Sequence, residues 1–548
     1  MAERVARAFL RFAGQVVASL ATFTVLERLV VTLGRLPPAA YERAFFAPAI
    51  AARVAHLLRA RAPGVVLVGA VALGAAAAAA ALARPAGRRR ALGLLAGWDA
   101  VDEGPALRWL VGAATGIATC ALAGYPYNAY FDRAHAADRL LLVALWGALL
   151  WRPAFALPFA LVASAVAQQF QVPLASYSWT EMELLVRIPI LLAAFWCVRA
   201  MLHERTADAF VFLLCCLLAV TWWASGSGKL RVGWITHPHV DLLLLGAYAN
   251  GWLGDLPADT VVRLADVVAA WRLPLMLLTL AVECGALLLL WRRWSLVAFP
   301  AITIAFHLGA FALTGILFWK WILLDVALLA FLLQGRRVAR LRIFSPAHFA
   351  LAVAVVLGHP AWVAARNLTW FDTPLTYAMR LEGVDAAGGV HVLPAGFFRP
   401  YAETFVLETF PYLSPHTQLT GPMGVTQSRD VAAALVAARE PSDVFALERT
   451  LATSRYDAER GASFDRFVAR WLRTLNRRTA RGARARPGTP RHLWTFPLDA
   501  DWDGTPAIVA VRVVELTSFY DGRTLRVIRV RPLRTIDVAR GVSTPAGP

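Results

Sequence analysis

The chain has 548 residues, 58% of them hydrophobic, and a formal net charge of +19. Such a composition excludes an ordinary soluble protein of this size and indicates a polytopic helical membrane protein. Much of the positive charge lies in short loops between apolar segments, which is the usual pattern for cytoplasmic loops. No basic stripe interleaved with aromatic residues is visible, so nucleic-acid binding is not expected.

The N-terminal stretch 8–34 is long and apolar but contains Arg11, Glu27 and Arg28. It predicts a first membrane or interfacial helix and not a removed signal peptide. Further apolar segments follow at 65–83, 107–124, 140–151, 153–168, 184–202, 207–225, 273–291, 294–314, 318–335 and 347–365. Together they predict roughly nine to eleven helices, because 140–168 is either two short helices or one helix kinked at its prolines.

The arginines between these segments predict an orientation. Arginine-rich loops at 84–90, 199–205, 292–293 and 336–342 alternate consistently if all four are cytoplasmic. The arginine-containing 35–62 segment then lies on the non-cytoplasmic side and is the exception to this rule. On this topology Lys229 and His307 both belong to the outer half of the bundle, and the last helix delivers a C-terminal domain to the non-cytoplasmic side. We therefore expect three parts: a membrane or interfacial segment at 1–64, a transmembrane domain at 65–366 and an extracytoplasmic domain at 367–548.

The C-terminal domain is predicted to be mixed α/β and partly β-rich. Ser463 and Ser428 are expected to cap helices, the first of which has apolar residues at helical spacing. Strands are expected at 402–410, 507–516 and 525–530, with a turn at Asp521-Gly522. All five cysteines lie in apolar segments earlier in the chain, so this domain needs no disulfide or thiolate metal site.

Only two of the 55 basic side chains are lysines. Arginine does not give up its proton in proteins, whereas a desolvated lysine can, so each lysine is a candidate base. Lys229 follows Gly226 and Gly228, which are expected to end the helix beside a pocket; the alternative is a lysine that reaches the membrane interface. Lys320 lies between two tryptophans and is interpreted as an interfacial anchor.

Two further ionisable residues lie within apolar segments. His307 is either a functional group at membrane depth or a neutral histidine bonded to a backbone carbonyl. Glu283 either holds a base or relays a proton, or it simply pairs with Arg187 or another buried donor. His237 and His239 lack a carboxylate or thiolate at ligand spacing, so no metal site is expected. The sequence also lacks the phosphate-loop, dinucleotide-binding, zinc-protease and serine-hydrolase motifs.

One pattern in the chain resembles a known family. It consists of the apolar run 212–225, Gly226-Ser227-Gly228-Lys229-Leu230, Gly233-Trp234, a helix with Glu283, Arg292-Arg293 and Phe306-His307-Leu308-Gly309. In this order the residues resemble the horizontally transferred transmembrane (HTTM) family, bacterial relatives of vitamin K-dependent γ-glutamyl carboxylase. The likeness covers roughly 90–366 and implies a protein of the bacterial inner membrane.

The resemblance implies a lipid quinol of the vitamin K or menaquinol type as cofactor. Lys229 matches the lysine that deprotonates the quinol in the animal carboxylase, and His307 matches a histidine of the same pocket. Trp223, Gly226, Gly228 and Glu283 are the accompanying candidate cofactor-binding residues. Membrane lipid and quinone are the expected partners, together with an extracytoplasmic protein substrate or partner.

One departure from the family is specific. The carboxylase has a further active-site histidine before the helix that here begins near Glu183, but this chain has no histidine from Ala136 to Leu202. The resemblance therefore favours quinol binding over glutamate carboxylation. The alternatives are a quinol-dependent oxygenase or carboxylase, a non-catalytic quinone- or lipid-binding membrane protein whose outer domain engages a partner, and, with less support, a transporter.

Overall fold

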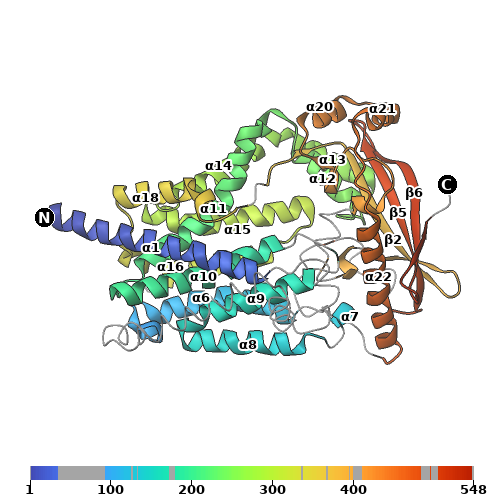
Figure 1. The fold of residues 1–548 in the computed structure, drawn as a ribbon. Coiled ribbons are helices and arrows are strands. Elements are labelled where there is room, and N and C mark those ends of the chain that lie inside the picture. Colours follow the sequence, from blue (N-terminus) through green and yellow to red (C-terminus); the bar gives the residue numbers. More distant parts are fainter. Residues whose placement is uncertain are drawn as a thin grey trace.

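The computed structural model describes residues 2–34, 93–124, 128–131, 134–171, 174, 179–334, 337–365, 368–393, 395–398, 401, 410–482, 494 and 504–545. Figure 1 shows a bundle of long helices on one side and an antiparallel sheet flanked by further helices on the other. The N-terminus lies at the end of the bundle that faces away from the sheet. The chain is thus mostly helical in its first two thirds and β-rich near its C-terminus.

The helical part of the chain contains helices of mostly apolar composition. They are α1 (Ala2–Gly34), α6 (Gly104–Gly124), α8 (Ala136–Trp151), α9 (Ala156–Gln171), α10 (Trp179–Leu202), α11 (Asp208–Val232), α12 (Asp241–Ala249), α13 (Ala258–Ala270), α14 (Arg272–Gly285), α15 (Arg293–Thr314), α16 (Trp319–Leu333) and α18 (Pro346–Leu357). Helix α11 is buried along almost its whole length, including both of its cysteines. A helix that is apolar all round belongs in the interior of a bundle, and α11 accordingly occupies that place.

Six helices of the described residues are long and apolar enough to cross a membrane, or seven if the bent pair α13–α14 counts as one span. This is fewer than the predicted number. Helices α8 and α16 are too short by the same measure, and α18 spans only 12 residues. The predicted segment 65–83 lies outside the described residues.

The prediction that was left open for 140–168 is resolved. The 140–168 stretch is two helices, because α8 ends at Trp151 and a short 3-10 turn, Pro153–Phe155, precedes α9. Pro153 sits at the start of that turn, where its missing N–H costs nothing. The predicted helix at 273–291 corresponds to α14, which meets α13 at a 66° bend.

The C-terminal region contains a five-stranded antiparallel sheet of order β3-β2-β5-β6-β7. Its strands are β2 (Leu375–Asp385), β3 (Val390–Leu393), β5 (Ile508–Tyr520), β6 (Leu525–Asp537) and β7 (Ser543–Pro545). The predicted strands at 507–516 and 525–530 are confirmed and extend further than expected. The backbone N–H of Asp521 donates a hydrogen bond to the carbonyl oxygen of Thr524 and so closes the turn between them. The predicted strand at 402–410 lies almost wholly outside the described residues.

Helices α20 (Arg429–Ala437), α21 (Pro441–Leu451) and α22 (Ala458–Thr479) accompany the sheet. Ser428 caps α20 as predicted, since its hydroxyl accepts the amide hydrogen of Val431. The predicted start of α22 at Ser463 is wrong: the helix begins earlier, at Ala458, where Asp457 accepts two backbone N–H groups. A separate two-stranded pair, β1 (Phe371–Asp372) with β4 (Val425–Thr426), lies where the C-terminal region begins.

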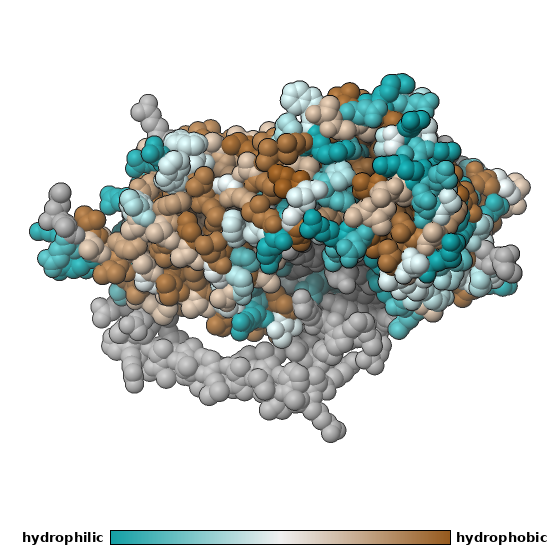
Figure 2. Space-filling view, turned by 90° about the horizontal axis from the view of Figure 1, so that it is seen from above, coloured by the Kyte–Doolittle hydropathy of each residue, from teal (hydrophilic) through white to brown (hydrophobic). Residues whose placement is uncertain are grey.

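Hydrophobic and hydrophilic side chains on the surface are distributed differently over the helical part and the C-terminal part. In Figure 2 brown, hydrophobic side chains cover much of the helical part, and teal, hydrophilic side chains gather over the C-terminal part. Exposed apolar side chains of the bundle include Leu140 (72% exposed) on α8 and Trp271 (63% exposed) at the α13–α14 bend. Large apolar residues in contact with water are costly, so this surface is compatible with a membrane protein.

Candidate functional site

Lys229 lies near the C-terminal end of α11, at the end of the bundle that meets the C-terminal region. The prediction that Gly226 and Gly228 end this helix is wrong, because α11 continues to Val232. It ends at Gly233, which adopts a left-handed conformation (φ 67°) that favours glycine. Dense packing on every side of α11 outweighs the low helix propensity of its glycines.

Gly226 instead permits a close helix crossing. A Cβ atom at this position would lie 2.9 Å from Cβ of Glu283 and 2.8 Å from Sγ of Cys284, both on α14. Real Cβ atoms do not approach other heavy atoms so closely, so only glycine lets the two helices meet here. The crossing brings Glu283 next to Lys229, one turn further along α11.

Lys229 and Glu283 form a buried ion pair. Nζ of Lys229 lies 2.5 Å from Oε1 of Glu283, and each side chain is only 7% exposed. The other carboxylate oxygen, Oε2, is buried and has no hydrogen-bond partner in the described part of the chain. Of the roles considered for Glu283, pairing with Arg187 is wrong, because Arg187 binds Glu27 and Glu183.

Two tryptophans flank the lysine ammonium. The centre of the Trp234 ring lies 5.6 Å from Nζ, and that of Trp370 lies 6.0 Å away. Trp234 follows the end of α11, whereas Trp370 directly precedes β1 of the C-terminal region. The electron-rich ring faces stabilise a cation between them. The ammonium is therefore enclosed by both parts of the chain.

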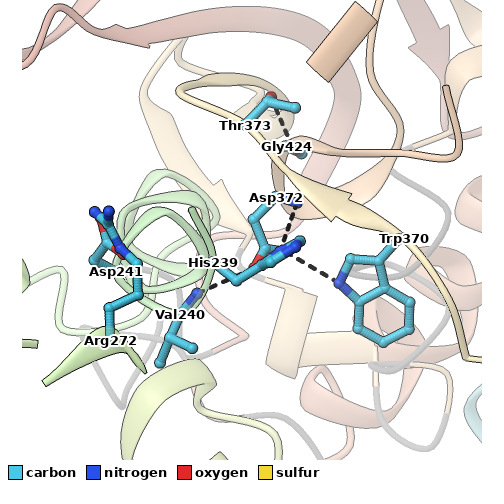
Figure 3. Close-up of polar contacts among 8 residues, drawn as sticks. All are labelled: His239, Val240, Asp241, Arg272, Trp370, Asp372, Thr373 and Gly424. Atoms are coloured by element: carbon cyan, nitrogen blue, oxygen red, sulfur yellow. Dashed lines mark hydrogen bonds and ion pairs between the residues drawn. The ribbon is translucent and has the colours of Figure 1, made fainter. Parts of the chain in front are cut away.

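A second buried acid–base pair lies beside these rings. The His239 ring is stacked on Trp234 with centres 4.4 Å apart, and Nδ1 of His239 lies 3.1 Å from Oδ2 of Asp372. Asp372 also accepts hydrogen bonds from the backbone N–H of Val240 and from the indole N–H of Trp370. Figure 3 shows Asp372 amid these three partners. The carboxylate thereby fixes His239 and Trp370 in place.

His307 is buried in α15 among aromatic rings and does not contact Lys229 by any hydrogen bond or ion pair that the described residues show. Its ring lies 5.1 Å from that of Trp222 and 5.3 Å from that of Phe318. Its Nδ1 lies 3.8 Å from Oδ2 of Asp325, which also accepts a hydrogen bond from Thr303. Trp222 precedes Lys229 by seven residues, or about 10 Å along a helix. His307 thus belongs to a neighbouring cluster, linked to Lys229 through α11.

The remaining predicted residues are placed as follows. Trp223 is partly buried and packs against the bundle core, and Gly228 is buried inside α11. Lys320 is buried (7% exposed), with Nζ 5.7 Å from the Trp319 ring centre, and its role as an interfacial anchor stays a prediction. Within the described ranges, no hydrogen bond or ion pair joins Lys320 to Lys229 or Glu283.

Asp372, Trp370 and Asp325 belong to these clusters but were not predicted from the sequence. Asp325 could have been found as an acidic residue within an apolar run. Asp372 carries no such signal, because it follows the last helix in a polar stretch. Among the described residues, no group of three or more histidine, cysteine or acidic side chains is arranged to hold a metal ion.

Comparisons with protein-family models, curated proteins and solved structures gave no match to this chain.

Proposed function

We propose that the chain is an integral membrane protein of the carboxylase-like HTTM type that binds a lipid quinol beside Lys229 and removes a proton from its hydroxyl group. The observation that carries the proposal is the buried Lys229–Glu283 pair, whose Oε2 atom has no hydrogen-bond partner within the described residues. A buried polar atom without a partner is costly and marks a place where a ligand donor is expected.

The chemistry of the surrounding groups fits a quinol. The Glu283 carboxylate offers an acceptor to the hydroxyl group of a quinol, and the rings of Trp234 and Trp370 give the surroundings of Lys229 an aromatic, apolar character. When bound, the quinol supplies an acidic hydroxyl and a ring that oxygen can oxidise. His307 and Trp222 are proposed to line the apolar wall further inside the bundle.

Lys229 is proposed as the base, with Glu283 as the group that takes its proton. Transfer of the ammonium proton to Glu283 leaves a neutral amine and a neutral carboxyl group, both of which are tolerated in an apolar site. The amine then accepts the hydroxyl proton and becomes an ammonium again beside the newly negative oxygen. At the end Glu283 holds the proton that came from Lys229, and Lys229 holds the proton that came from the quinol. The site therefore has one proton more than it had at rest.

The test uses full-length protein in detergent under argon, with added menaquinol and a spectroscopic measurement of quinol ionisation. Wild type is expected to bind and ionise the quinol. Lys229→Arg keeps the positive charge beside Glu283 but removes the group that can give up a proton, so binding is expected to persist while ionisation falls at least 100-fold. Lys320→Arg is the matched control, since it changes the other buried lysine.

The outcomes separate the candidate functions. Wild type that does not bind quinol refutes the proposal altogether. Full ionisation by Lys229→Arg shows that Glu283 acts alone and refutes the role of Lys229 as base. Binding without ionisation in wild type favours the alternative, a non-catalytic quinone- or lipid-binding protein whose C-terminal domain engages a partner.

A further inference from the structure

We propose that His239 and Asp372 form a proton exit from the buried Lys229–Glu283 pair to a cavity between the bundle and the C-terminal region. The inference rests on the proposed function in one respect only: a site that gains a proton must release it before it can act again. A path for that proton is a property of the protein itself and can be measured without any quinol.

His239 has the burial and the partners of a proton carrier. Its side chain is wholly buried, and its Nε2 atom has no hydrogen-bond partner in the described part of the chain. Its Nδ1 atom lies within hydrogen-bond distance of two different groups, Oδ2 of Asp372 at 3.1 Å and the backbone N–H of Asp372 at 3.3 Å. Nδ1 can therefore donate to the first or accept from the second, so both neutral tautomers keep a hydrogen bond.

Asp372 keeps this histidine in one orientation. Two donors other than the imidazole bind its carboxylate: the backbone N–H of Val240 at 3.2 Å and the indole N–H of Trp370 at 3.0 Å (Figure 3). A carboxylate with fixed partners orients a histidine and stabilises its protonated form, as it does in catalytic dyads. The pair thus tolerates a transient positive charge on a ring that is closed off from solvent.

The inner end of the proposed path is the Lys229 pair. The Lys229 ammonium lies 5.6 Å from the centre of the Trp234 ring, and the His239 ring is stacked on that same ring. No direct hydrogen bond joins the two pairs within the described residues, so transient water molecules would carry the proton across. The proton leaves the Glu283 carboxyl and His239 takes it up on one ring nitrogen. The protonated ring then releases a proton to water of the outer cavity, so that Glu283 ends as a carboxylate and His239 as a neutral ring.

The outer end is a half-open cavity of about 330 Å³. Pro238 and Asp241, on either side of His239 in the sequence, line it, as does Pro374, two residues after Asp372. Its walls carry charge: Asp241 accepts two hydrogen bonds of 2.7 Å from Arg272, and Asp266 and Arg439 also line it. Such a cavity holds water that can accept a proton.

The neighbouring charges do not block this route. Arg272 is neutralised by its two-fold contact with Asp241, which Figure 3 shows beside His239. His237, whose ring centre lies 5.4 Å from that of His239, bonds to the backbone of Asp372 and not to its carboxylate. His239, with its bonded carboxylate, is thus the better placed of the two imidazoles, and His237 provides a matched control.

The experiment follows protonation of Glu283 after a light-induced pH jump, in full-length protein in nanodiscs without quinol. The infrared band of the Glu283 carboxyl group is identified by its loss in Glu283→Gln. We expect His239→Ala and Asp372→Asn to slow the appearance of this band at least ten-fold, with wild-type rates in His237→Gln. Millimolar imidazole in the buffer is expected to restore the rate in His239→Ala, since it supplies the missing proton carrier.

An unchanged rate in His239→Ala overturns the proposal, and so does a Glu283 band that never responds to pH. Should His239→Ala fail to fold, His239→Gln keeps the side-chain size and gives the same comparison. The outcome is distinct from that of the quinol experiment: a protein that binds no quinol but shows a His239-dependent rate has the path and lacks the proposed function. A protein that ionises quinol but shows no His239 dependence has the function and another path.

Discussion

The helix crossing at Gly226 gives the sharpest structural prediction. Replacing Gly226 by alanine adds a Cβ that would lie 2.8 Å from Sγ of Cys284, 2.9 Å from Cβ of Glu283 and 3.0 Å from the backbone nitrogen of Cys284. The sulfur can rotate away, but the other two atoms move only if α14 itself moves. Because α14 carries Glu283, the substitution is expected to disturb both stability and the ion pair.

The magnitude follows from two opposing effects. Overpacking a well-packed interior costs about 1–3 kcal/mol, and simultaneous contact with two atoms that only backbone movement can relieve places Gly226→Ala near the upper end. Alanine inside a helix is about 1 kcal/mol more favourable than glycine. The net loss of stability is therefore expected to be about 2 kcal/mol.

Gly285→Ala is the matched control, because this glycine lies at the end of α14 and a Cβ there meets nothing within 4 Å. It is expected to be neutral or stabilising by up to about 1 kcal/mol. Reversible unfolding of both variants in detergent, followed by circular dichroism, measures the difference. A Gly226→Ala variant as stable as Gly285→Ala, with the Lys229–Glu283 contact intact, would refute the argument that glycine is needed at this crossing.

Three further predictions concern other contacts. Glu283→Gln alone is expected to lose about 3–5 kcal/mol of stability because it leaves a buried ammonium unpaired, whereas Lys229→Met combined with Glu283→Leu is expected to lose much less; a double-mutant unfolding cycle measures both. Burial opposes ionisation of Glu448, but hydrogen bonds from Arg529 and a tyrosine outweigh it and hold the pKa of that carboxyl below its ordinary value of 4.5. Its contribution to stability is therefore complete above about pH 4.5 and lost as the pH falls through the lower folded-state pKa, so unfolding midpoints between pH 3 and 6 are expected to depend less on pH in Glu448→Gln. Gly246→Ala would place a Cβ 2.1 Å from a backbone carbonyl of the C-terminal region, so it is expected to weaken the contact of α12 with that region and to speed limited proteolysis between the two.

Local patterns in the sequence were enough to predict much of the fold. The apolar runs predicted α6, α10, α11, α15 and α16, because a sufficiently long run of apolar residues is by itself a local signal for a helix. The strand signals before and after Asp521 predicted β5 and β6 for the same local reason. The break before α9 was left open, since a proline can either kink a helix or start a new one.

The pairing of the site residues could not be predicted. Lys229 and Glu283 stood out because charge is rare in apolar sequence, but they are 54 positions apart, and their contact depends on how α11 crosses α14. The role of Gly226 was misjudged for the same reason. Glycine disfavours a helix when the helix is considered alone, but at a crossing it allows two helices to approach, and the second effect prevails here.

The predicted domain boundary at 366–367 divides the site that the fold assembles. Trp370 and Asp372 lie beyond that boundary, yet one faces the Lys229 ammonium and the other holds His239. Without them the ammonium would lose one of its two flanking rings, and His239 would lose its carboxylate. The C-terminal region therefore closes the site as well as adding a sheet, and any chemistry at Lys229 depends on residues from both parts of the chain.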